Sequence, residues 1–447
     1  ALPLIDFTKI WMSLICWIFC FPLLLMSDPV SSQFHSIALI LFLFFISLVC
    51  LKLKKQSVII VVALLIIGWM ITDELPSWGQ LKNSSEFVLI FACLIPTLTL
   101  VRSTAMTMGS VTDTQKRLAT LDSTRSANGI QLTSHMLGGI VNVGTFALVA
   151  VALPQDADSE RRYIAGTATL RGMNSAILWS PFFLSFAVAS VYLPEGFATG
   201  AIALGVFNAV SFLLITQIIF SPKGSNISIL QSLSPLKPIA VRLVVIIVSV
   251  IVTSALIKLT ALSAVCVAMP ALCIFQLLRR PKKIKDVCKN FNTLQRNSGD
   301  EVVIISLSML IASQLGQTDQ ITAVLTSFFG LVPDVKIVLF FLPFLVWASS
   351  VIGIHPVISS APLLAFIAPS LTVYDAAFVA QAHMIGWSTG TMVSFASLST
   401  IIAAENFKIS TAKVSFGVNF LVAAGLATGG GLILGFLHAI FIDILGP

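Results

Sequence analysis

The sequence has few charged side chains for its length. Of its 447 residues, 10% are Asp, Glu, Lys or Arg and 57% are hydrophobic. Soluble globular domains carry about 25% charged residues, so the composition excludes an ordinary soluble domain. The apolar runs are continuous and helix-length, without the short alternation of β-barrel strands. We therefore predict an all-α polytopic membrane protein, whose helices satisfy their own backbone hydrogen bonds within the lipid.

Signatures of several chemistries are also missing. The seven cysteines show no CxxC or Cys/His spacing, so neither disulfides nor a zinc site is expected. The sequence contains no Walker loop, dinucleotide fingerprint, HExxH or GxSxG motif. We therefore expect no cofactor, no ATP hydrolysis and no motif-bearing proteolysis within this chain. The net charge of +7 comes largely from clusters between apolar runs, which is typical of membrane topology and not of nucleic-acid binding.

Twelve apolar runs predict membrane-spanning helices, and two shorter pieces, 130–153 and 353–371, predict arms of re-entrant hairpins. The last run exceeds the length needed to cross a bilayer, and Thr428–Gly431 predicts a bend within it. The twelve runs are 10–27, 36–52, 57–73, 86–103, 164–190, 195–220, 239–258, 260–279, 301–316, 335–351, 374–401 and 411–444.

Lysine and arginine clusters predict the orientation of the chain. If the clusters near residues 52–55, 116–125, 223–237 and 279–285 face the cytoplasm, residues 104–163 must enter and leave on the same side. This parity supports a hairpin near 130–153, and it places the second, near 335–371, on the outer side. The two halves then have opposite orientation, as in an inverted repeat. The predicted organisation is an extra helix at 1–29, repeat one at 30–220, a cytoplasmic linker at 221–238 and repeat two at 239–447, in a bacterial inner membrane.

Two similar motifs surround histidines within apolar sequence. Residues 133–142 read TSHMLGGIVN, and residues 353–362 read GIHPVISSAP. Each is followed by a segment rich in glycine and polar residues, at 166–175 and at 386–394. Paired interrupted segments in the two halves of a membrane protein indicate a transporter's binding site. The alternative is that these small residues only allow helices to pack closely.

The candidate binding residues lie at expected turns and unwound segments. Turns are expected at Thr133–His135 and at Gly353–Pro356, because backbone groups left free within a membrane must line a cavity or bind a ligand. Hydroxyl and amide groups there suit Na⁺ as well as a carboxylate. The candidate substrate-binding residues are Thr133, Ser134, His135, Asn142, Arg171, Asn174, Ser175, His355, Ser388, Thr389 and Thr391.

Arg171 is the most informative single residue. An arginine within a span usually faces the protein interior or a cavity, and its fork binds carboxylate or phosphate through two hydrogen bonds. The alternative is that Arg171 reaches the cytoplasmic interface together with Arg161 and Arg162. Arg125, just before the first expected turn, is a secondary candidate; its alternative role is that of a topology charge.

Three histidines within apolar runs are candidates for proton coupling. Histidine is the side chain whose ordinary pKa lies near neutral pH, and the three candidates are His135, His355 and His383. A histidine in a helix is also a common hydrogen-bonded structural residue. Na⁺ is the other candidate coupling ion, and no metal site is assigned.

The order of these elements resembles the ion transporter superfamily, in particular its divalent anion/sodium symporter branch. The resemblance covers residues 85–447 as architecture, with a helix, a re-entrant hairpin, a broken helix and a closing helix in each repeat. In that family a Ser-Asn-Thr signature occupies each hairpin tip. The matching positions here read Thr133-Ser134-His135 and Ile354-His355-Pro356, so the signature is absent. The resemblance implies a scaffold-mediated homodimer and an elevator movement, whereas dicarboxylate specificity and sodium coupling do not carry over.

The sequence thus predicts a secondary active transporter, not an enzyme, for a small or amphipathic organic anion. Its partners would be that anion and membrane lipid, and no nucleic acid. Two alternatives stay open. A carrier or flippase for a lipid-linked phosphate would use the same arginines in a cavity open towards lipid. An integral-membrane enzyme would use His135 and His355, although catalysis seldom needs inverted halves.

Overall fold

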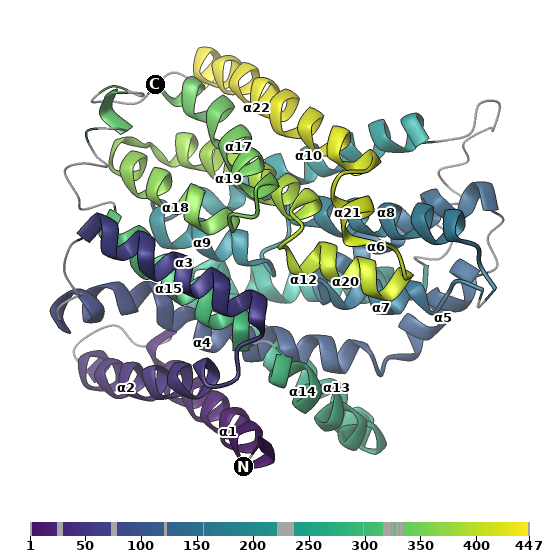
Figure 1. The fold of residues 1–447 in the computed structure, drawn as a ribbon, viewed down its shortest axis with the longest axis horizontal. Helices are drawn as coiled ribbons and strands as arrows, with labels where there is room; N and C mark the ends of the chain where they lie inside the picture. The colour runs from purple at the N-terminus through teal and green to yellow at the C-terminus, as the bar shows by residue number, and fades with distance from the viewer. Residues whose placement is uncertain are drawn as a thin grey trace. The chain divides into compact units, whose positions relative to one another are not determined.

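A computed structural model describes residues 2–24, 30–72, 78–119, 123–154, 156–220, 237–297, 299–315 and 334–445, with a few more between 323 and 330. Every regular element in these ranges is a helix (Figure 1). The predicted all-α class is therefore confirmed for this part of the chain. The predicted linker, 221–238, lies outside the described residues except for its last two positions.

The chain forms two compact units. Unit 1 comprises Ala1–Thr107 and Ile246–Val324, and unit 2 comprises Met108–Val245 and Leu325–Pro447. Each unit thus takes one segment from each of the halves predicted at 30–220 and 239–447. The predicted halves are therefore not the compact units, because helices that pack together come from both.

Unit 1 is built around α4. Helix α4 packs against α1, α2, α13, α14 and α15, and 83% of its apolar stretch Val88–Ala105 is buried. Its Thr99 and Ser103 hydroxyls donate to carbonyls one turn earlier in the same helix, which satisfies these two buried donors. The elements of unit 1 are α1 (Leu2–Cys20), η1 (Pro22–Leu24), α2 (Val30–Cys50), α3 (Lys55–Thr72), α4 (Trp78–Ala105), α13 (Ala261–Arg279), η3 (Pro281–Lys283), α14 (Ile284–Asn297) and α15 (Gly299–Leu315). Helix α12 (Lys237–Ile257) contains the boundary between the two units.

Unit 2 contains two sets of helices, α6–α9 and α17–α20, that pack against each other. Helix α6 packs against α8, and α17 against α19; in addition α7 meets α20, α9 meets α18, and α8 meets α19. The elements of unit 2 are α5 (Gly109–Ala119), α6 (Ser123–Val141), α7 (Gly144–Ala150), α8 (Ser159–Ala176), α9 (Leu184–Tyr192), α10 (Phe197–Phe220), α17 (Val335–Val351), α18 (Pro356–Ile367), η4 (Ala368–Ser370), α19 (Val373–Val393), α20 (Leu398–Phe407), α21 (Thr411–Ser415) and α22 (Val418–Leu445).

Several helices have the length and the surface that lipid requires. Five stretches among the described residues are long and apolar enough to cross a membrane. Four of them, all except Val88–Ala105, also expose large apolar side chains, such as Leu256 in α12 and Leu421 in α22. The structure thus has the helices of a membrane-integral protein. The five stretches are Val88–Ala105, Phe197–Phe220, Ala240–Ile257, Leu262–Arg279 and Thr411–Phe441.

The interruptions after α8 and α19 lie later in the chain than the sequence predicts. Helix α8 continues to Ala176 and α19 continues to Val393, so the expected unwinding at 166–175 and 386–394 is wrong except at its last residue. The non-helical segments are 177–183 and 394–397. Helix α22 runs without a break through Thr428–Gly431, and the interruption there lies at 416–417 instead.

One of the two expected turns is correctly placed. Gly353 has φ +90°, and His355 caps the N-terminus of α18 at the turn between α17 and α18. The first turn is predicted wrongly, because Thr133–His135 lie inside α6. The chain turns at Asn142 instead, whose φ of 54° is a left-handed conformation that asparagine tolerates better than most residues.

Asp375 links the start of α19 to α22 through hydrogen bonds. One carboxylate oxygen accepts hydrogen bonds from the Thr372 backbone and hydroxyl in a capping box, and the other lies 2.7 Å from the Nε2 atom of His438. We expect Asp375→Asn to lower the thermal midpoint more than Thr372→Ala, which removes only the cap and costs about 1 kcal/mol. Thermal unfolding of the purified variants measures both. Equal losses would show that the contact with His438 adds nothing.

Candidate functional site

Helices α6 and α8 approach each other closely through glycines. A Cβ atom at Gly172 would collide with the Gln131 carbonyl oxygen, and one at Gly138 would lie 2.9 Å from the Met173 Cα atom. Gly386 and Gly390 have the same role in α19, where a Cβ would meet Val346 or Ser350 of α17. The glycines that predict unwinding therefore allow close helix packing.

Arg171 lies in the core of unit 2. Its side chain is 3% exposed, and its guanidinium reaches helices on three sides. Nε donates to the Gln131 Oε1 atom of α6 at 3.3 Å, and Nη1 donates to the Asn419 Oδ1 atom of α22 at 2.8 Å. The guanidinium carbon lies 4.0 Å from the centre of the Phe220 ring in α10, a cation–π contact. The expectation that Arg171 faces the interior is confirmed.

The charge of Arg171 is not neutralised by a described side chain. The ion pairs found in the described ranges are Lys52–Asp6, Lys283–Asp286 and His438–Asp375, and none involves Arg171. Its partners are two amide oxygens and an aromatic ring. Burying a cation without an anion is costly, because the charge loses its hydration. This arginine is therefore ready to accept a carboxylate or a phosphate.

Asn174 joins the two sets of helices in unit 2. Its side-chain oxygen accepts a hydrogen bond from Thr391 at 2.6 Å, and its carbonyl oxygen accepts one from Ser388 at 2.8 Å. The Thr391 carbonyl accepts in turn from Ser397, which caps α20. Thr389 differs, since its hydroxyl donates back to carbonyls of its own helix. Of the six predicted substrate-binding residues on α8 and α19, Asn174, Ser388 and Thr391 thus hydrogen-bond one another.

His135 is fully engaged by neutral partners. Its Nε2 atom accepts a hydrogen bond from the Trp179 indole at 3.2 Å, so its Nδ1 atom carries the proton and donates to Ser175 at 2.8 Å. Ser175 donates to the Gly172 carbonyl. Further protonation would break the contact with Trp179. The arrangement favours a structural role over proton coupling for His135.

Two hydroxyls beside His135 lack a partner. Thr133 and Ser134 are buried in α6, and neither oxygen has a hydrogen bond within the described structure. Thr145, in the first turn of α7, has a buried hydroxyl in the same condition. Unsatisfied buried hydroxyls are unusual, and a bound polar group would give these three a partner.

His355 and His383 contact the same tryptophan. The Trp387 ring lies edge-on to both imidazoles, with ring centres 5.5 Å apart in each case. His383 is completely buried and its Nε2 atom bonds the Ser185 carbonyl at 3.0 Å, which leaves its Nδ1 atom buried without a partner. His355 uses Nδ1 to accept from the Val357 backbone at 3.4 Å. Its side chain is only partly buried, and it is the most accessible of these three histidines.

The polar residues at the actual interruptions escaped the sequence prediction. Ser180, in the segment between α8 and α9, donates to the Gly139 carbonyl at 2.6 Å and accepts from the Phe182 backbone. Pro181 beside it is the signal for a helix end that was available in the sequence. Arg125 lies in the first turn of α6, but its side chain is outside the described structure.

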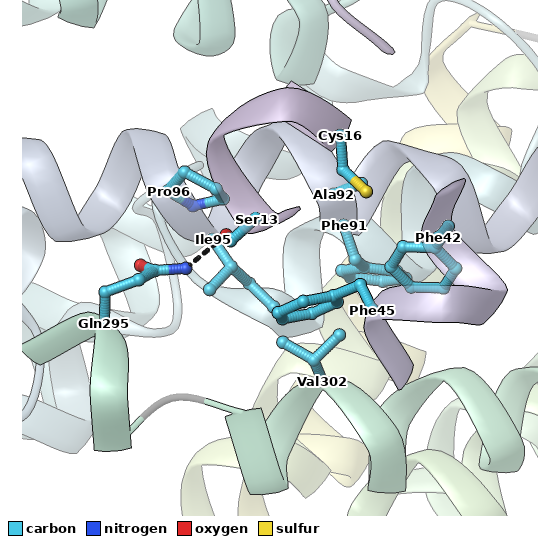
Figure 2. Close-up of a pocket in the computed structure, with 10 residues that line it drawn as sticks. All are labelled: Ser13, Cys16, Phe42, Phe45, Phe91, Ala92, Ile95, Pro96, Gln295 and Val302. Carbon is cyan, nitrogen blue, oxygen red and sulfur yellow. Dashed lines mark hydrogen bonds between the residues drawn. The ribbon is translucent and has the colours of Figure 1, made fainter. Parts of the chain in front are cut away.

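The cavity of unit 1 in Figure 2 is too small for a substrate. Its volume is about 10 Å³, room for no more than one water molecule. Gln295 of α14 points towards Ser13 of α1 and donates to its hydroxyl at 2.6 Å, as the dashed line shows. The rings of Phe42, Phe45 and Phe91 fill the other side of this space.

A larger cavity lies between α6 and α8 in unit 2. Its volume is about 230 Å³, and its charged lining consists of Asp158, Glu160 and Arg161 near the start of α8. Ile130 also lines it, one residue before the Gln131 side chain that holds Arg171. Arg171 itself is not among the residues that line this cavity.

The chain matches no protein-family model, and a search of curated proteins finds no match. Function is therefore inferred from the geometry of unit 2.

In unit 2, Arg171 is held by α6, α10 and α22, whereas Asn174 is held by α19. His135 and His355 contact different tryptophans.

Proposed function

We propose that the protein is a secondary active transporter for a small or amphipathic organic anion, and that Arg171 binds the anionic group. The observation that carries this proposal is a buried guanidinium that has amide and aromatic partners but no described carboxylate. A substrate carboxylate or phosphate would supply the missing charge. Arg171 is also the one Lys or Arg buried among the described residues of unit 2.

The helix order in unit 2 supports an inverted repeat. A helix, a turn and a short helix (α6–α7) precede an interrupted helix (α8–α9), and the same order returns in α17–α18 and α19–α20. The contacts are reciprocal, since α7 meets α20 while α9 meets α18. Each first short helix thus packs on the second part of the other interrupted helix, which is what two repeats around a common centre require. In the proposal, unit 2 carries the substrate and unit 1 supplies the contact of a homodimer.

A flux experiment tests the transport proposal. The purified chain is reconstituted into liposomes, and uptake of a panel of mono- and dicarboxylates and phosphate esters is measured under an imposed Na⁺ or proton gradient. Gradient-driven accumulation of one anion class is the expected result. The absence of accumulation with every anion, under both gradients and in both directions, would contradict the proposal. Empty liposomes supply the background.

One observation favours the alternative of a lipid-linked phosphate. Phe220, which stacks on Arg171, ends α10, and Ile215, Ile218 and Ile219 just before it are exposed and apolar. An anion with a long apolar tail would find this surface beside the guanidinium. Transfer of a fluorescent lipid phosphate between leaflets, without gradient-driven uptake of soluble anions, would favour a flippase.

The histidines give a pH prediction. We expect His355→Gln to flatten the pH dependence of flux, because His355 lies at a turn and is the most accessible of these three histidines. His135→Gln should leave the profile in place, because both ring nitrogens of His135 already have neutral partners. Flux at a series of external pH values measures both variants. A flattened profile for His135→Gln alone would reverse the assignment.

A further inference from the structure

The end of α13 and the start of α14 carry a dense positive charge. Six cations occur within 279–289, and the one carboxylate there, Asp286, pairs with Lys283 at 3.1 Å. The structure gives no carboxylate partner to the other five in the part of the chain that it describes. We call these six side chains the basic surface; they are Arg279, Arg280, Lys282, Lys283, Lys285 and Lys289.

The basic surface begins where an apolar helix surface ends. Ile274, Phe275 and Leu278 of α13 are 54%, 52% and 73% exposed, as side chains that face lipid tails would be. The guanidinium of Arg279 lies 4.4 Å from the centre of the Phe275 ring, which holds this cation against the apolar flank of the helix. The first charges of the surface thus lie at the level where lipid tails give way to headgroups.

Helix α14 packs against the rest of unit 1 through the face opposite to its lysines. Val287, Phe291 and Gln295 recur every four residues, are buried, and lie on the side of α14 that packs against α4 and α1. Lys285 and Lys289, also four residues apart, project from the other side and are exposed. The cations of α14 are therefore displayed by a helix that unit 1 holds in place.

We propose that the basic surface is a binding site for the headgroups of anionic phospholipids. Phosphate oxygens accept charge-assisted hydrogen bonds from lysine and arginine, and clusters of four to eight such residues beside a spanning helix are suited to acidic lipids. Topology alone requires these charges only while the chain inserts into the membrane. The proposal adds a lasting preference for acidic lipid at this place, and it does not depend on the substrate in unit 2.

Cys288 allows a test at the surface itself. Cys50 and Cys288 are the exposed cysteines of the described structure. In the Cys50→Ser chain, a fluorophore on Cys288 reports quenching by brominated lipids in reconstituted liposomes. We expect brominated phosphatidylglycerol to quench more than the same amount of brominated phosphatidylcholine, and high salt to remove the excess. Equal quenching by the two lipids would overturn the proposal.

Three triple variants decide where the preference arises. Replacing Lys282, Lys285 and Lys289 with glutamine should abolish the excess quenching, and replacing them with arginine should keep it. Glutamine at Lys116, Lys336 and Lys408 removes the same charge from exposed positions elsewhere and should leave the excess unchanged. Loss in the control variant as well would assign the effect to net charge and overturn the proposal.

Inorganic phosphate added to phosphatidylcholine liposomes should not change the quenching. A change would show that a free anion, and not a lipid, occupies the surface.

Discussion

Arg171→Gln is expected to lower anion flux at least about 30-fold while leaving the protein as stable as the wild type or more so. Removing one member of a buried charged pair costs about 2–5 kcal/mol of binding, and 2 kcal/mol corresponds to about 30-fold. Arg171→Lys should lie between the two, because lysine keeps the charge but loses the planar fork. Flux in liposomes, with equal amounts of reconstituted protein, measures the loss.

The stability half of this prediction separates binding from structure. The substitution leaves acceptors on Gln131 and Asn419 short of a donor, which costs about 1–3 kcal/mol for each. The substitution also removes a desolvated cation that has no described anion, and this relieves a burial cost of several kcal/mol. Glutamine can in addition donate to one of the two acceptors. We therefore expect the thermal midpoint without substrate to stay constant or rise.

Arg162→Gln is the matched control for Arg171. It removes the same charge from the first turn of the same helix, where the side chain is partly exposed, and it should leave flux unchanged. Loss of both flux and stability in Arg171→Gln would mean that the arginine only holds α6, α8 and α22 together. In that case the anion site would have to lie elsewhere.

Gly172→Ala is expected to destabilise the protein by about 3 kcal/mol, at the upper end of what overpacking costs. The new methyl group would collide with the Gln131 carbonyl oxygen and lie 2.9 Å from the Ser134 Cβ atom. A carbonyl within a helix cannot rotate away, so α6 and α8 must separate. Separation would also weaken the contact of Gln131 with Arg171. Thermal unfolding in detergent measures the loss.

Gly425 and Gly429 provide the control for this substitution. Both are in α22, and an added methyl group would meet no atom within 4 Å. Alanine there should be neutral or stabilise the helix by up to about 1 kcal/mol, since glycine is the poorer helix former. A Gly172→Ala protein as stable as Gly425→Ala would contradict the close approach of α6 and α8.

The sequence predicts the helices of this chain well because their signal is local. The run 335–351 coincides with α17, and 195–220 and 260–279 differ from α10 and α13 by one or two residues. Continuous apolar sequence of this length has few other solutions in lipid.

The interruptions are predicted less well because glycine has two meanings in a membrane helix. The sequence predicts helix breaks at Gly172 and Gly386, but both glycines allow close packing, which depends on a partner helix that the local sequence does not reveal. The helix ends follow other signals, namely Pro181 after α8 and the left-handed Asn142 after α6. Burial of Arg171 is predictable from its apolar neighbours. Its partner Asn419 is not, because it lies far along the chain.

The contact between Arg171 and Asn419 joins residues 248 positions apart, and this separation has a consequence for biosynthesis. At about 5–20 residues per second, a ribosome needs roughly 12 to 50 seconds to travel from one to the other. During that interval α8 has left the ribosome while α22 has not been made. Until α22 is made, Arg171 therefore lacks the Asn419 partner that it has in the folded protein.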